Sequence, residues 1–255
     1  STRLDYAAPQ AISLRNIDLQ TKLGQVQGSL SLDPQGALAT DLTGQLNDLG
    51  NFVDRIKGAA SFDLSASGPL DAIEATVNIA VEEGVAAGYQ VTGLVLTAEG
   101  LASPTAPQGD ISLSGQIDGK PVQASGKVVS ANGVTKVDGL ALEIGPNTLK
   151  GALSLGADLT PTGDITFDFP DISLLAALAG QTAGGDLQGS VALVSSAGRT
   201  SAQIKANGAR ITRDGITIDR PAIDLNATDI RALAANGTVT ADALTSGANR
   251  IEGLR

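Results

Sequence analysis

The feature that most constrains this chain is a strict alternation of apolar and polar residues. Between 73 and 82, five aliphatic residues at odd positions alternate with Glu, Thr, Asn, Ala and Glu. A period of two predicts a β-strand with one apolar and one polar face. The continuous apolar runs of a doubly covered parallel sheet are missing. The same alternation recurs in five further segments, 111–117, 149–155, 165–169, 187–193 and 223–225.

Turn signals between these segments predict how the strands connect. Asp118-Gly119, Asn132-Gly133 and Asp214-Gly215 favour the two-residue turns of β-hairpins. We therefore expect about 16 antiparallel strands, and a sheet of more than about ten strands must curl, split or close. The predicted fold is all-β. It is a long antiparallel meander over 1–255, one continuous segment curled into a taco-like groove with an apolar concave face and one or two short helices.

Two short segments, near 47–56 and 171–180, depart from the alternation. The first has apolar residues at helical spacing, opened by Asn47 or Asp48 as a cap. The second opens on Asp171 as its N-cap and has a glycine beyond its end. Both are predicted as short helical insertions that cross the concave face or close its end.

A glycine opens several of the alternating units. The units begin at Gly28, Gly151 and Gly189, with Gly163 as a variant. Glycine inside a strand pattern indicates a bend or a close approach of the neighbouring backbone. We therefore expect a bend or a close approach of the neighbouring strand's backbone at these four glycines.

Composition excludes most catalytic chemistry. The chain has no His and no Cys, which removes the commonest general base, nucleophile pairings and metal ligands. Its net charge of −10 opposes nucleic-acid binding. Aromatic residues make up only 2% of the chain, too few for the sugar platforms of a glycan-active enzyme. We expect no enzyme activity, no cofactor and no metal.

Three stretches carry a resemblance to a known family. The run 140–155, the apolar run within 169–179 and the glycine-led segment 184–193 resemble the strand–turn–strand units of the TamB family. These proteins are inner-membrane-anchored subunits of the translocation and assembly module, related to AsmA-like proteins. The resemblance in residue pattern extends over nearly the whole chain. No N-terminal membrane anchor is present, so we expect an internal segment of such a protein.

The resemblance implies a location and partners. It implies a periplasmic repeating-groove sheet whose full-length protein is anchored in the inner membrane by a segment absent here. It also implies a role in phospholipid transport or outer-membrane protein assembly. A barrel assembly partner of the TamA type would bind through another part of the full-length protein.

The alternation predicts which side chains face a lipid. An aliphatic face must be buried on itself, on another protein or on lipid. A closed sandwich remains an alternative to the groove, and an adhesin or autotransporter passenger remains an alternative function. The residues expected to line a lipid groove are Ile73, Val77, Ile79, Val81, Ile111, Leu113, Leu153, Leu155, Ile165, Phe167, Val191 and Leu193.

Overall fold

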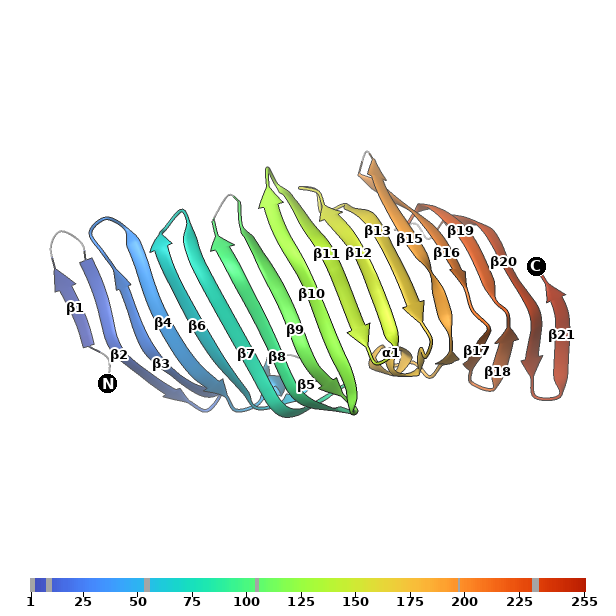
Figure 1. The fold of residues 1–255 in the computed structure, drawn as a ribbon, viewed down its shortest axis with the longest axis horizontal. Coiled ribbons are helices and arrows are strands. Elements are labelled where there is room, and N and C mark those ends of the chain that lie inside the picture. The colour runs from blue at the N-terminus through green and yellow to red at the C-terminus, as the bar shows by residue number, and fades with distance from the viewer. Residues whose placement is uncertain (1–2, 8–10, 53–55, 104–105, 197, 231–233) are drawn as a thin grey trace. The chain divides into compact units, whose positions relative to one another are not determined.

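Long antiparallel strands account for most of the chain (Figure 1). A computed structural model of the protein describes residues 3–7, 11–52, 56–103, 106–196, 198–230 and 234–255. These residues form 21 strands, one short α-helix and one 3-10 turn, in two compact units, Ser1–Asn132 and Gly133–Arg255. The predicted all-β antiparallel meander with short helical segments is confirmed. One continuous groove over 1–255 stays a prediction.

In unit 1, each long strand pairs antiparallel with the next long strand along the chain. The short strand β5 is different, because it pairs with the far end of β7. The elements of unit 1 are β1 (Arg3–Ala7), β2 (Ala11–Thr21), β3 (Gly24–Leu32), β4 (Ala37–Leu46), η1 (Leu49–Asn51), β5 (Ile56–Gly58), β6 (Ala60–Pro69), β7 (Ile73–Ala86), β8 (Tyr89–Ala102), β9 (Gln108–Ile117) and β10 (Lys120–Ala131).

Unit 2 follows the same antiparallel plan, with a hairpin set between β16 and β19. That hairpin, β17–β18, pairs with β14 on one side and β20 on the other. The elements of unit 2 are β11 (Val134–Ile144), β12 (Asn147–Leu155), β13 (Pro161–Phe169), α1 (Ser173–Leu178), β14 (Gly184–Gly185), β15 (Leu187–Ser196), β16 (Arg199–Asn207), β17 (Arg210–Arg213), β18 (Ile216–Asp219), β19 (Ala222–Asp229), β20 (Ala234–Ser246) and β21 (Asn249–Leu254).

The hairpin turns have the conformation that their residues predict. Asp118 and Gly119 both have positive φ, 52° and 71°, between β9 and β10. Asp214 and Gly215 do the same between β17 and β18, at 48° and 78°. Two consecutive positive φ values define the type I′ turn, whose twist matches that of the flanking strands. These turns confirm the antiparallel connections.

Where the alternation of apolar and polar residues is interrupted, a β-bulge keeps the apolar residues on one face. In β2, the register shifts between Leu14 and Ile17, and Asn16 takes a φ of 53°. The extra residue places Leu14 and Ile17 on the same face although they are three positions apart. β8 and β11 are bulged in the same way, between Thr92 and Val95 and between Val137 and Leu140.

The two units share one pairing pattern. Gly28 pairs with Leu42 in unit 1, and Gly151 pairs with Ile165 in unit 2, each 123 positions later. Beyond the insertions the offset becomes 127, so the pair Val77–Ala98 of β7 and β8 corresponds to Ile204–Leu225 of β16 and β19. The bulges of β2 and β11 also occupy equivalent positions. The two units are therefore equivalent in strand pairing, as an internal structural repeat, although their sequences differ.

The insertions are equivalent too. η1 and β5 lie between β4 and β6, as α1 and β14 lie between β13 and β15. Gly58 of β5 pairs with Gly84, and Gly185 of β14 pairs with the equivalent residue, Ile211. β16–β17 and β18–β19 thus take the places of the long strands β7 and β8. Pro221 stands where β8 continues, and a proline cannot donate its ladder hydrogen bond.

The predicted helices form, but they are shorter than expected. Near 47–56, only η1 forms, capped by Asp48, whose carboxylate accepts the backbone N–H of Gly50 at 2.9 Å. Ile56 belongs to β5 instead, because strand pairing with β7 outweighs helical spacing. In the second segment the N-cap of α1 is Ile172, without a side-chain cap, so the prediction of Asp171 as N-cap is wrong; the Asp171 carboxylate accepts the backbone N–H of Ser173 at 3.0 Å just before the helix. Val53 lies outside the described residues.

Candidate functional site

An apolar face runs across the strands of unit 1. Register places Leu64 of β6 beside Val77 of β7, and Val77 beside Ala98 of β8. The neighbouring row contains Phe62 and Ile79 in the same relation. Side chains two residues apart on a strand point to the same side. We call the resulting surface the apolar face of unit 1; its central residues are Leu42, Phe62, Leu64, Val77, Ile79, Leu96, Ala98, Ile111 and Leu113.

Unit 2 has an equivalent surface. Ile165 pairs with Val191, and Val191 pairs with Ile204 of the next strand. Phe167 stacks on Phe169 with ring centroids 5.0 Å apart. We call this surface the apolar face of unit 2; its central residues are Leu140, Leu142, Leu149, Leu153, Ile165, Phe167, Val191, Leu193, Ile204, Ile223 and Leu225.

The register places all twelve predicted groove residues on these two faces. In unit 1 they are Ile73, Val77, Ile79, Val81, Ile111 and Leu113, and in unit 2 they are Leu153, Leu155, Ile165, Phe167, Val191 and Leu193. Glu74, Ser112 and Thr166 lie on the opposite, polar side, as the alternation predicts. The side chains are unequally covered, since Ile111 is 42% exposed and Val81 only 8%. That these residues contact lipid stays a prediction.

Away from the end that carries its insertion, neither face is covered by a second layer of the described chain. The elements that contact one another extensively are strand neighbours, together with η1 against β5 and α1 against β14. The accessible surface is 15179 Å². A compact monomer of 25.5 kDa exposes about 10,400 Å², and two separate compact domains of half that mass about 12,500 Å² in total. The protein thus exposes more surface than either compact arrangement would, as expected for a single-layer sheet whose apolar face is uncovered.

Glycines and phenylalanines fit together on these faces. Gly44 pairs with Phe62, and a Cβ built on Gly44 would lie 2.5 Å from the Phe62 ring. In unit 2 the residue types are exchanged, because Phe167 pairs with Gly189 and its ring would lie 2.8 Å from a Cβ there. Each ring thus covers the backbone of a glycine on the next strand. The prediction that Gly189 marks a close approach is confirmed, and the same holds at Gly28, Gly151 and Gly163.

The end of each sheet that carries the insertion is the better buried. In unit 1, five apolar side chains near this end are at most 9% exposed: Ala60, Val81, Val91, Ile117 and Val122. In unit 2, Leu174 of α1 is 4% exposed, and Asn147 joins the β11–β12 turn to the start of the helical segment. Its amide donates to Ile144 and accepts from the backbone N–H of Asp171, both at 3.1 Å. The insertions thus lie at one end of each apolar face.

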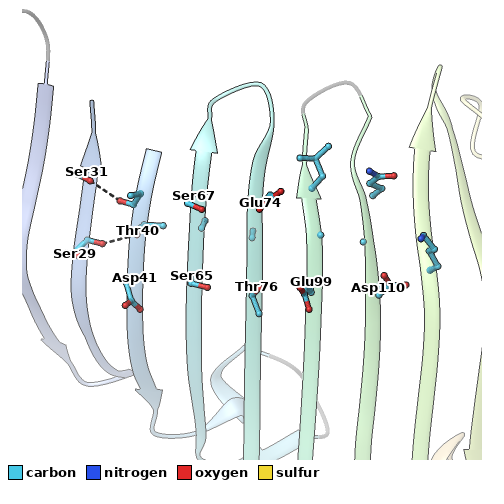
Figure 2. Close-up of a pocket in the computed structure, with 18 residues that line it drawn as sticks. Ser29, Ser31, Thr40, Asp41, Ser65, Ser67, Glu74, Thr76, Glu99 and Asp110 are labelled. Atoms are coloured by element: carbon cyan, nitrogen blue, oxygen red, sulfur yellow. Dashed lines mark hydrogen bonds between the residues drawn. The ribbon is translucent and has the colours of Figure 1, made fainter. Parts of the chain in front are cut away.

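The polar side of unit 1 carries a hollow that sequence reasoning missed. Figure 2 shows Ser29, Asp41, Ser65, Thr76, Glu99 and Asp110 in a row across neighbouring strands. The hollow has a volume of about 960 Å³. A twisted sheet is saddle-shaped, so each of its faces is concave in one direction. The alternation predicted the polar side but gave no signal for its hollow.

The repeat shows that the fold does not require the acidic lining. Glu99 and Asp110 stand directly opposite each other, an arrangement that costs stability. Asn226 and Asn236, the equivalent pair in unit 2, are neutral. Among the described residues, no group of three or more His, Cys, Asp or Glu side chains is placed to hold a metal ion.

Arginine–carboxylate pairs join the outer strands of unit 2. Asp219 accepts from Arg210 at 2.9 Å and from Arg250 at 3.4 Å, and the Arg210 hydrogen bond is the main reason that the pKa of Asp219 is lowered. The hydrogen bond to Glu252 contributes most to raising the pKa of Arg250. The arginine side chains are more than half exposed, so we expect the pairs to add little stability.

Comparison with known proteins leaves the chain without an assigned family. Within the described part of the chain, no helix combines the length and apolarity needed to cross a membrane. The resemblance to the TamB family stays a prediction. The chain matches no family model, no curated protein and no solved structure.

Proposed function

We propose that the apolar face of each unit holds the acyl chains of lipids and shields them from water. The observation that supports this most is the uncovered, single-layer apolar face. Exposed apolar surface of this extent marks a binding site for lipid or another apolar partner. The faces are aliphatic and carry few rings, which suits flexible hydrocarbon chains.

The energetics require no specific polar site. Each CH₂ group removed from water contributes about 0.8 kcal/mol, so a long acyl chain gains affinity from its length alone. The polar side chains lie on the opposite side of each sheet, where they keep the protein hydrated. Binding of this kind depends on a continuous apolar surface more than on any single residue.

The cellular setting of the proposal rests on the resemblance to the TamB family alone. We propose a periplasmic segment of a protein anchored in the inner membrane, with phospholipid or segments of outer-membrane proteins as cargo. A TamA-type partner would contact another part of that protein. The internal repeat agrees with a scaffold lengthened by adding units.

Site-specific photo-crosslinking tests the lipid assignment. A photoreactive residue is placed at Val77 or Ile165 on the apolar faces, and at the adjacent Thr76 or Thr166 on the polar sides. The protein is then incubated with radiolabelled phospholipid and irradiated. We expect lipid capture at the first two positions only. Equal capture at adjacent positions of one strand would refute the assignment, because neighbouring side chains point to opposite faces.

A further inference from the structure

The turn between β12 and β13 carries a leucine where this type of turn favours glycine. The backbone N–H of Leu159 donates to the carbonyl oxygen of Gly156 at 2.9 Å, and the N–H of Gly156 donates to that of Thr160 at 3.0 Å. The equivalent turn of unit 1, residues 33–37, has the same two hydrogen bonds. Hairpin turns of this kind include a residue with a left-handed backbone, normally glycine. Gly36 takes this place in unit 1 with a φ of 84°, and Leu159 takes it in unit 2 with a φ of 60°.

Folding alone does not account for Leu159. A left-handed conformation is unfavourable for any residue with a Cβ, and a leucine that compensated for this by packing would be buried. The side chain of Leu159 is instead 67% exposed. A single exposed leucine is common on protein surfaces, but one that is also held in an unfavourable backbone conformation indicates a role in function.

Unit 1 exposes a leucine beside the equivalent turn. Leu70 follows the end of β6, and its backbone N–H donates to the carbonyl oxygen of Gly36 at 3.3 Å. Its side chain is 53% exposed. Each unit thus exposes a leucine at this end of its sheet, on the turn itself in unit 2 and on the adjoining loop in unit 1. We call the turn 33–37 with Leu70 the leucine end of unit 1, and the turn 156–160 with Leu159 the leucine end of unit 2.

The leucine ends lie where the apolar faces are less covered. β4 and β13 each begin at the leucine end of their unit and end at its insertion (Figure 1). Leu155 directly precedes the turn of unit 2, and Ile12 pairs with the residue that precedes the turn of unit 1. Both are 38% exposed, whereas Val81, near the insertion of unit 1, is 8% exposed. Each apolar face is therefore more accessible from its leucine end.

The carboxylates of the two turns are engaged within the turns. Asp33 accepts the backbone N–H groups of Gln35 and Ala37 at 2.9 and 2.8 Å. Asp158 accepts the backbone N–H and the hydroxyl of Thr160 at 3.2 and 2.6 Å. Polar groups that are already hydrogen-bonded cost less to bring into an apolar environment. The turns can therefore approach a lipid interface without leaving these groups unpaired.

We propose that each leucine end inserts its leucine into the surface of a zwitterionic phospholipid bilayer. The leucine occupies different positions in the two units, and a fluid lipid surface accepts either position, whereas a protein pocket of matched shape requires one. The net charge of −10 disfavours an anionic surface. The inference rests on the lipid function proposed above, because insertion here brings lipid to the more accessible end of each apolar face.

Flotation of the full 255-residue protein with phosphatidylcholine vesicles tests the insertion. The double variant Leu70→Ser/Leu159→Gly removes both leucines. The control Leu23→Ser removes an exposed leucine from the β2–β3 turn, at the insertion end of unit 1. We expect the double variant to lose about tenfold or more in partitioning to vesicles, and Leu23→Ser to lose less than about twofold. No vesicle binding by the folded wild-type protein, or an equal loss in Leu23→Ser, would overturn the proposal and favour a protein as the partner.

Two further measurements separate this inference from folding and from the lipid function. Leu159→Gly alone should keep or raise the urea-unfolding midpoint, because glycine suits a φ of 60°; a lower midpoint would assign Leu159 to folding. Native mass spectrometry with dispersed lysophosphatidylcholine, below its micelle concentration, reports on the apolar faces alone, and the double variant should keep this uptake. A wild-type protein that takes up no dispersed lipid contradicts the lipid function. Uptake together with vesicle binding that does not depend on the two leucines contradicts only insertion at the leucine ends.

Discussion

Exchanging Gly44 and Phe62 tests whether the two units are versions of one structure. The double variant Gly44→Phe/Phe62→Gly recreates the arrangement of the equivalent pair in unit 2. Phe62→Gly alone should cost about 2–3 kcal/mol, since its ring is only half-buried and glycine weakens a strand. Gly44→Phe alone should cost about 1–3 kcal/mol, because its Cβ would lie 2.5 Å from the Phe62 ring and 2.5 Å from the Gln25 carbonyl oxygen.

In the double variant, the new ring occupies the space that the old ring leaves. We expect a total loss of about 1–2 kcal/mol, well below the sum of the single losses, and so a coupling energy of about 2 kcal/mol. Tyrosine fluorescence during urea unfolding reports on unit 1 alone, because Tyr6 and Tyr89 both lie there. At an m-value of roughly 2 kcal/mol/M, this coupling energy corresponds to about 1 M urea. The unfolding midpoint of the double variant should therefore lie about 1 M above the value expected if the two single losses simply added. Single losses that add within about 0.5 kcal/mol would refute the equivalence.

Three further predictions concern stability and lipid transport. Gly28→Ala should lower the free energy of unfolding by roughly 1–3 kcal/mol, measured by urea titration, since its φ is 143° and a Cβ would overlap the Asp41 carbonyl oxygen. Hydrogen bonds from two backbone N–H groups lower the pKa of Asp48. The Asp48 carboxylate therefore stabilises the folded state above its ordinary pKa of 3.8, and this stabilisation is lost as the pH falls through the lowered pKa. Asp48→Asn should reduce the fall of the unit 1 urea-unfolding midpoint as the pH is lowered through this range. On the proposed lipid-transport function, Val191→Arg should impair outer-membrane integrity in cells whose full-length protein keeps its normal abundance, because an unpaired charge interrupts the apolar face, whereas Val191→Ile and Ser154→Glu should not.

Much of the fold follows from local sequence signals. Alternation determines the faces, Asp-Gly pairs determine the type I′ turns, and Asp48 caps the first helical segment. The bulges leave a weaker signal in the sequence. Two apolar residues are three positions apart instead of two, as Leu14 and Ile17 are, but this spacing does not by itself identify a bulge. Recognising that spacing as a bulge requires knowing which neighbour pairs with it.

The equivalence of the two units could not be predicted from sequence. Equivalent positions keep their register but exchange their residues, as Gly44–Phe62 and Phe167–Gly189 do, so similarity disappears while the packing is preserved. The hollow on the polar side arises from sheet twist, which alternation does not encode.

Native mass spectrometry of the purified protein shows directly whether the apolar faces hold acyl chains. The protein is produced in bacterial cells, released gently into the gas phase and then dissociated to identify what it carries. We expect the protein to retain phospholipid, which Val77→Asp displaces from unit 1 and Val191→Arg from unit 2, whereas the folded control Ser154→Glu keeps it. A folded protein that carries no lipid, and takes up none from phospholipid vesicles, would contradict the claim that the apolar faces hold acyl chains.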